Sequence, residues 1–163
     1  MTNLKNIYFT IAAIFFVSIA NAQISKAEIR ATGLTCSMCS NAINKQLKSM
    51  PEVVNVETDL NTNTFTITLK EGNNLTPKIF KDKVEKAGFF VGTLFITANA
   101  DAISKANYIK VNTVDAKSNE IRFQVLDKGF VTQKEFKKLT KTFKNVATYA
   151  INNEDDFHIK VLN

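Results

Sequence analysis

The spacing of apolar residues changes repeatedly along residues 24–97, and this change of period constrains the fold more than any other feature of the sequence. Apolar and polar residues alternate with a period of two in several short stretches, which is typical of half-buried strands. These stretches are 24–32, 53–60, 64–69 and 89–97. Helical spacing predicts one helix that Pro51 ends and a second that begins at Thr76-Pro77 and ends at Gly88.

The predicted elements of residues 23–98 follow the order β-α-β-β-α-β. This order is typical of the ferredoxin-like sandwich, an α+β fold in which both helices cover a single face of an antiparallel sheet. We therefore expect residues 23–98 to form a domain of this kind.

Residues 99–163 predict a smaller second segment, for which the sequence assigns no known fold. Alternating residues at 108–113 and 121–126 predict a β-hairpin, and Thr132 and Glu135 stand in capping-box register at the start of a helix. Two short strands are expected at 147–151 and 157–162. The predicted order of this segment is ββαββ.

Residues 1–22 predict a secretory signal peptide. Lys5 precedes an apolar run that ends at Ile19, and Ala20 and Ala22 stand at the positions that a signal peptidase reads. An uncleaved anchor would need about 20 apolar residues, and this run is shorter. We expect an exported mature chain that begins at Gln23, is periplasmic or secreted, and keeps no integral membrane segment.

The composition argues against most enzyme classes and against nucleic-acid binding. The chain has 1 His, 2 Cys and no Trp, so we expect that it is not an enzyme. Its net charge of +6 comes from basic residues spread along polar faces instead of one dense block. The lysines of the helix that starts near Thr132 could face an acidic partner or an anionic membrane, although a solvated helix face is the usual interpretation of such a run.

Both cysteines lie between the first predicted strand and the first predicted helix. A helix N-terminus favours the thiolate forms of Cys36 and Cys39, and thiolates select Cu(I) and compete well for Zn(II). The loop holds no His or further Cys that could complete a tetrahedral site, whereas two-coordinate Cu(I) needs no further ligand. The sequence therefore favours Cu(I) over Zn(II) at Cys36 and Cys39.

The stretch Gly33-Leu34-Thr35-Cys36-Ser37-Met38-Cys39 resembles the Gly-Met-Thr-Cys-x-x-Cys pattern of the heavy-metal-associated domain family. That family includes small copper chaperones, the periplasmic mercury-binding protein and the amino-terminal domains of copper-transporting ATPases. The resemblance covers residues 24–97. It implies that Cys36 and Cys39 are metal ligands for Cu(I), with Hg(II) or Zn(II) as alternatives, and that a copper-transporting or copper-accepting protein is the partner.

The same resemblance implies roles for two apolar neighbours of the cysteines. Leu34 takes the place of the family's Met, which packs under the loop. Phe89 stands where many bacterial members have Tyr, and it can close the loop sterically. Met38 is expected to point to solvent and not to act as a ligand.

Two other functions stay open at this point. A thiol-disulfide enzyme is disfavoured because neither Pro51 nor Pro77 follows the cysteines at the position of a thioredoxin-like cis-proline. The other alternative is an exported interaction module with a structural or redox-active Cys36-Cys39 disulfide. His158 could be a third metal ligand, but its place between Phe157 and Ile159 predicts a surface residue of a strand. The sequence does not distinguish copper trafficking from buffering or resistance.

Overall fold

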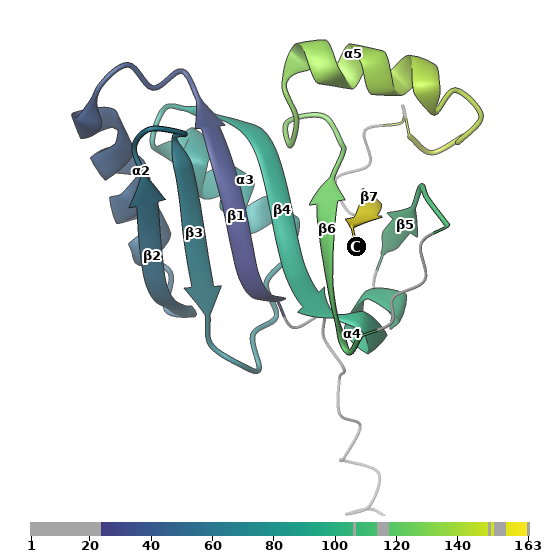
Figure 1. The fold of residues 1–163 in the computed structure, drawn as a ribbon, viewed down its shortest axis with the longest axis horizontal. Coiled ribbons are helices and arrows are strands. Elements are labelled where there is room, and N and C mark those ends of the chain that lie inside the picture. The colour runs from purple at the N-terminus through teal and green to yellow at the C-terminus, as the bar shows by residue number, and fades with distance from the viewer. Residues whose placement is uncertain (1–23, 106, 114–117, 150, 152–155, 163) are drawn as a thin grey trace, which may run out of the picture.

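One seven-stranded sheet organises the part of the chain that the structure describes. The computed structural model describes residues 24–105, 107–113, 118–149, 151 and 156–162, so the predicted signal peptide lies outside the described residues. The strands lie in the order β2-β3-β1-β4-β6-β7-β5 (Figure 1). Their bounds are β1 Ile24–Thr32, β2 Val53–Asp59, β3 Thr64–Leu69, β4 Phe90–Asn99, β5 Tyr108–Lys110, β6 Glu120–Val125 and β7 Phe157–Leu162.

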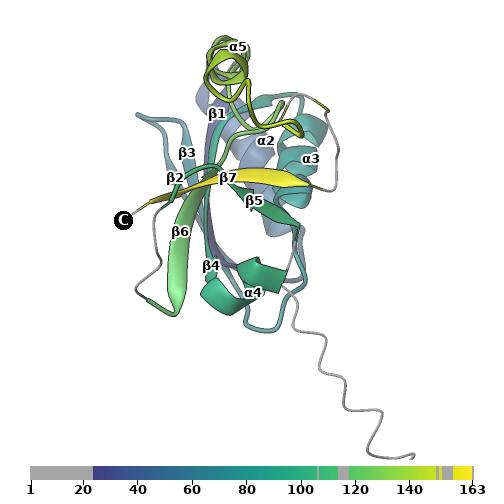
Figure 2. The ribbon, with the colours of Figure 1, turned by 90° about the vertical axis from the view of Figure 1, so that its right-hand side faces the viewer.

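The first four strands carry two helices on one face. Helices α2 (Ser37–Lys48) and α3 (Pro77–Lys86) lie behind β1 to β4 in Figure 1, and Figure 2 shows both on the same side of the sheet. The neighbouring pairs β2–β3, β3–β1 and β1–β4 are all antiparallel. The predicted α+β class is confirmed, and these elements follow the order β-α-β-β-α-β.

The core of this half lies between the sheet and the two helices. Alternation in β1 places Ala27 and Ile29 on the helix side, where they pack with Ile43 and Leu47 of α2 and with Phe80 of α3. The opposite face of β3 carries Thr64, Thr66 and Thr68. No helix among the described residues is long and apolar enough to cross a membrane.

The predicted hairpin of the second segment is wrong. Strand β6 does not pair with β5 but adds to the free edge of β4, and β7 lies between β6 and β5. Strand β5 pairs with β7 in parallel. An unpaired β4 edge would leave a row of backbone groups without partners, and β6 satisfies them while it buries Phe123 beside Ile96. Alternation indicates a strand but not its partner, which is why the sequence misplaced β6.

Two further parts of the predicted ββαββ order are wrong. A short helix, α4 (Ala100–Lys105), follows β4 directly and buries Ile103. At its start, the Asn99 side chain accepts a hydrogen bond from the Asp101 backbone N–H at 2.9 Å. The described residues of 147–151 form turns instead of a strand. There the backbone N–H of Tyr149 bonds to Val146 at 3.0 Å, so local bonds replace a strand ladder.

Helix α5 (Gln133–Thr142) begins as predicted, because the Thr132 side chain accepts a hydrogen bond from the Glu135 backbone at 3.2 Å. Its apolar side does not join the main core. Instead it packs on a second cluster formed by Leu126, Val131 and Tyr149. This cluster is separate from the main core, so the far end of the sheet carries two apolar layers.

The prediction that His158 is a surface residue is wrong. Its side chain is buried against Tyr149, because the second cluster covers the face of β7 that alternation had assigned to solvent. Asp127 accepts hydrogen bonds from the backbone N–H and from Nδ1 of His158, both at 2.7 Å, while Nε2 lies 2.9 Å from the hydroxyl of Thr148. Burial raises the pKa of Asp127, although the His158 hydrogen bonds oppose this effect.

We predict that a fragment of residues 23–98 folds alone, because it contains β1 to β3, both covering helices and all of β4 except its last residue, Asn99. Its melting temperature should lie below that of the mature chain, since the β4 edge loses its pairing with β6. Circular dichroism and thermal unfolding of the two proteins provide the measurement. An unfolded fragment beside a folded mature chain would show that the two segments depend on one core.

We predict that Asp127→Ala lowers the free energy of unfolding by about 2 kcal/mol, because it leaves the buried His158 ring and backbone N–H without their shared acceptor. Urea unfolding measures the change. The matched control is Asp82→Ala at an exposed position of α3, which should stay near the wild type. Equal stabilities of the two variants would contradict a structural role for the pair.

Candidate metal centre

The loop that carries both cysteines, residues 33–39, is held by its first two residues. Gly33 has a φ of +87°, a conformation that side-chain-bearing residues rarely adopt, and it turns the chain away from the end of β1. A Cβ at this position would lie 3.9 Å from Cδ1 of Phe89, so the Phe89 ring lies beside the first residue of the loop. Leu34 is half-buried against the main core, as expected of the residue that packs under the loop. We call residues 33–39 the cysteine loop.

The start of α2 brings the two sulfur atoms together. Cys36 is the N-cap residue, with extended backbone and no side-chain capping bond, and Cys39 lies in the first helical turn. The Cys39 N–H bonds to the Cys36 carbonyl at 3.1 Å, which closes this turn. As a result the two Sγ atoms lie 2.9 Å apart as free thiols. A spacing of three residues across a helix start is therefore sufficient to converge both sulfurs.

The surroundings of Cys39 favour its thiolate. Its pKa lies below the ordinary value, chiefly because the Cys36 side chain donates a hydrogen bond to it and then because of a backbone hydrogen bond from Thr35. The first turn of α2 holds no acidic residue that would oppose a negative charge there. The positive end of the α2 dipole acts in the same direction.

Both thiols can be reached from solvent. Cys36 is exposed and Cys39 is half-buried. The Met38 side chain between them is 80% exposed, which agrees with the expectation that it points to solvent. An incoming thiol can therefore approach this pair without displacing core residues.

Among the residues that the structure describes, none is placed as a third ligand beside the cysteines. In the described part of the chain, no group of three or more His, Cys, Asp and Glu residues is placed to hold a metal ion. Both ring nitrogens of His158 lie within hydrogen-bonding distance of Asp127 and Thr148 in the other half of the molecule. Two sulfur donors suit a soft ion of low coordination number better than Zn(II), which takes four ligands in structural sites.

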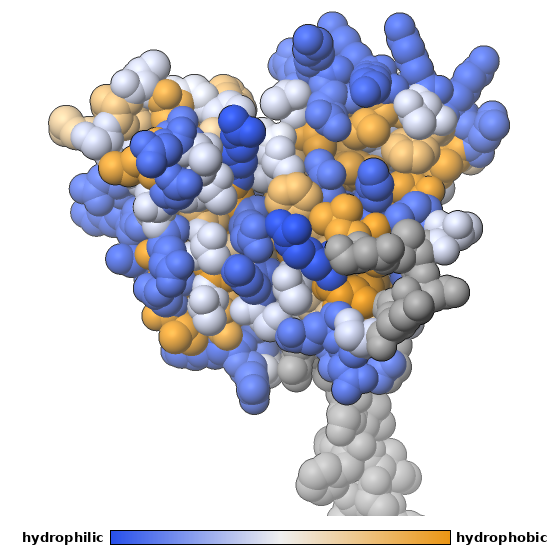
Figure 3. Space-filling view, viewed as in Figure 1, coloured by the Kyte–Doolittle hydropathy of each residue, from blue (hydrophilic) through white to orange (hydrophobic). Residues whose placement is uncertain are grey.

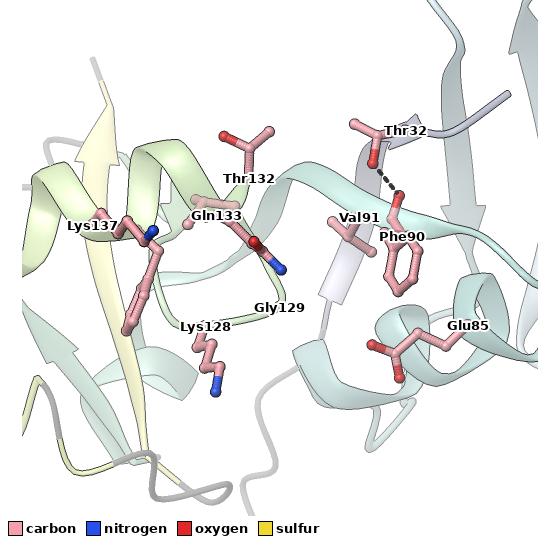
Figure 4. A pocket seen from close by; sticks show the side chains of 11 residues that line it. Thr32, Glu85, Phe90, Val91, Lys128, Gly129, Thr132, Gln133 and Lys137 are labelled. Atoms are coloured by element: carbon pink, nitrogen blue, oxygen red, sulfur yellow. Dashed lines mark hydrogen bonds between the residues drawn. The ribbon is translucent and has the colours of Figure 1, made fainter.

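Sequence reasoning missed a cleft beside the cysteine loop. It has a volume of about 500 Å³ and lies between the start of β4 and the residues that lead into α5 (Figure 4). Alternation from the buried Leu94 and Ile96 would place Phe90 on the core side of β4. A shift in the β1–β4 register, which leaves Gly92 as an extra residue, turns Phe90 outward instead, and its side chain is 68% exposed. The sequence carried no signal for this shift.

One comparison with known proteins matches the residues around this loop. The model of the family described as heavy-metal-associated domain matches residues 28–90. No curated protein matches the chain.

Solved structures with similarity to this chain include three copper-related domains. The yeast copper transporter domain Ccc2a, solved in apo and Cu(I)-loaded states, is 33% identical to this chain and has a TM-score of 0.36. The match covers 39% of this chain and 86% of the Ccc2a domain. The N-terminal domain of a potential copper-translocating P-type ATPase from Bacillus subtilis is 28% identical over 42% of this chain and 81% of its own, with a TM-score of 0.36. A chain of the Atx1-Cu(I)-Ccc2a complex is 32% identical over 40% of this chain and 89% of its own, also with a TM-score of 0.36.

We predict that Cys36→Ala raises the pKa of Cys39 toward its ordinary value, because the strongest hydrogen bond to that sulfur is lost. At neutral pH the fraction of Cys39 thiolate should then fall. Thiolate absorbance in the ultraviolet, followed against pH, provides the measurement. Ser37→Ala is the control. If the pKa of Cys39 is the same in Cys36→Ala as in the wild type, the Cys36 hydrogen bond is not what lowers it.

Proposed function

The chain belongs to the heavy-metal-associated domain family through residues 28–90, and from this membership and its paired thiols we propose that it binds Cu(I) between Cys36 and Cys39. In this proposal it is an exported, periplasmic or secreted protein that takes part in copper trafficking, buffering or resistance, and it is not an enzyme. Its metal-binding domain is residues 23–98, for which we propose the ferredoxin-like fold. The order of elements and the antiparallel pairing of β1 to β4 support this choice.

The observation that carries the proposal is the pair of free thiols 2.9 Å apart on an exposed loop. Two thiolates satisfy the low coordination number of Cu(I), whereas Zn(II) would need further ligands that the described residues do not place there. Hg(II) is the other soft ion that the resemblance allows. Direct competition between the metals would decide among them.

The exposure of the site suggests how the ion is passed on. A thiolate from a copper-transporting or copper-accepting protein enters as a third ligand beside Cys36 and Cys39. One of the original sulfurs then leaves and is protonated, while the partner's second thiol loses its proton and binds the ion. The second original sulfur leaves and is protonated in the same way, so the ion ends between the two sulfurs of the partner. The ion stays bound to sulfur at every step, so free Cu(I) is never released.

We predict that the reduced mature protein binds one Cu(I) per monomer and that Cys36→Ser or Cys39→Ser abolishes tight binding while the fold is kept. A serine hydroxyl is a hard and largely protonated donor, so each variant keeps only one soft ligand. The measurement is a competition titration with a Cu(I) chelator under reductant.

Ser40→Ala is a matched control, because Ser40 is a buried neighbour in α2 that lacks a sulfur. Equal Cu(I) affinities of the wild type and both cysteine variants would overturn the metal site. That result would instead support the interaction module, in which Cys36 and Cys39 form a disulfide.

We also predict that export leaves Gln23 as the first residue of the mature protein, because Ala20 and Ala22 follow the apolar run in the pattern that a signal peptidase reads. Intact-mass measurement of the exported protein checks this. Recovery of the uncleaved chain in the membrane fraction would show that residues 1–22 act as an anchor.

A further inference from the structure

The cleft beside the cysteine loop lies between the half of the chain that carries the cysteines and the segment that leads into α5. Thr32, Glu85 and Phe90 line it from the ends of β1, α3 and β4, while Gln133 and Lys137 line it from α5 (Figure 4). Thr32, which lines the cleft, immediately precedes Gly33 of the cysteine loop. Figure 1 shows α5 and the β1–α2 connection at the same end of the sheet. The space-filling view shows a hollow at this end between the β1 side and α5 (Figure 3).

The two walls of the cleft are fixed to each other at its base. A β-bridge pairs Thr93 of β4 with Val131, just before α5. The ammonium of Lys81 on α3 lies 5.6 Å from the ring centre of Phe130. On the first of these walls, Gly92 permits close packing of β4 against β1, because a Cβ there would lie 2.6 Å from Cγ2 of Thr32. These contacts make the cleft a preformed feature of the fold.

The lining of the cleft is largely apolar. Val91 and Val131 are buried, and Phe136 is half-buried on the second cluster. Phe90 adds a side chain that is 68% exposed. An exposed aromatic residue beside a concave apolar surface is typical of a site that binds a partner.

Lys128 and Lys137 line the cleft, and the stretch of chain that carries them is strongly basic. Residues 128–144 contain six lysines against one acidic residue, Glu135. All six lysines are exposed, and no ion pair joins them to a carboxylate in the described part of the chain. Glu85 is the acidic residue among those that line the cleft. We call the exposed lysines of this stretch the α5 lysine face: Lys128, Lys134, Lys137, Lys138, Lys141 and Lys144.

We propose that the cleft and the α5 lysine face dock an acidic amphipathic helix of the protein that exchanges metal with the cysteine loop. The apolar side of that helix enters the cleft over Phe90, and its carboxylates meet the lysines. This inference rests on the proposed function for the identity of the partner. A protein segment fits better than an anionic membrane, because the other apolar lining residues, Val91, Val131 and Phe136, lie inside a recess that a flat bilayer does not enter.

Binding to the metal-free protein tests the docking surface independently of copper. The probe is a fluorescently labelled helical peptide with one leucine face, one glutamate face and no cysteine. The variant Lys134→Glu/Lys137→Glu/Lys141→Glu should weaken its Kd at least about tenfold, since three attractions become repulsions. The control variant makes the same charge change at exposed lysines elsewhere: Lys45, Lys110 and Lys160.

A second variant separates the apolar cleft from the α5 lysine face. Phe90→Ser removes an exposed side chain, so the fold should be kept, and it should weaken the leucine-containing peptide but not an all-polar glutamate peptide. Equal weakening by the α5 and control variants, or no effect of Phe90→Ser, would overturn the docking site. Binding to phosphatidylglycerol vesicles without binding of the peptide would overturn it in favour of a membrane surface.

Metal transfer links the docking surface to the cysteine loop. The Cu(I)-loaded protein is mixed with the same acidic peptide extended by a Cys-x-x-Cys sequence, and with a version in which glutamine replaces glutamate. The α5 variant should slow transfer to the acidic peptide about tenfold and leave transfer to the glutamine peptide unchanged. Unchanged transfer to both peptides would refute the link. If the chelator titration shows no Cu(I) binding, the proposed function fails, while the peptide titration still decides whether the docking site exists.

Discussion

Strand β4 is paired along both edges, with β1 on one side and β6 on the other, and the rest of the structure depends on this arrangement. Its first residue, Phe90, pairs with Thr32 and so fixes the end of β1 from which the cysteine loop departs. A few residues later, Thr93 pairs with Val131 and fixes the start of α5. On the open face of the sheet, Arg122 of β6 forms an ion pair at 2.8 Å with Glu28 of β1. The two halves are therefore parts of one sheet, and β4 positions both the cysteine loop and the cleft.

The candidate metal centre combines a fixed backbone with accessible sulfurs. Gly33 and Leu34 hold the loop against the core, and the first turn of α2 sets the positions of Cys36 and Cys39. A pair of donors that converges before the ion arrives loses little conformational entropy on binding. In the proposed transfer, a third sulfur must reach the ion, and the exposure of Cys36 leaves room for it. Under the proposed function, a converged pair of thiols on an open surface suits transfer of the ion to a partner.

The sequence predicted best where local rules decide the structure. Pro51, Gly88 and the alternation of β1 each act within a few residues, so the elements of the first half and the placement of Cys36 and Cys39 at a helix start followed from them. The partners of β6 and the burial of His158 depend on contacts between segments far apart in the chain. Asp127 and Thr148, which meet the His158 ring, come from two different turns. Alternation describes one strand in one sheet and cannot show that a second apolar layer, built around Tyr149, covers its other face.

X-ray absorption spectroscopy of the Cu(I)-loaded mature protein tests the central claim most directly, because it reports which atoms surround the ion. The account predicts a first shell of two sulfur atoms, with no nitrogen or oxygen donor. A shell that contains imidazole nitrogen, or a metal bound without sulfur, would contradict the assignment of Cys36 and Cys39 as the ligands.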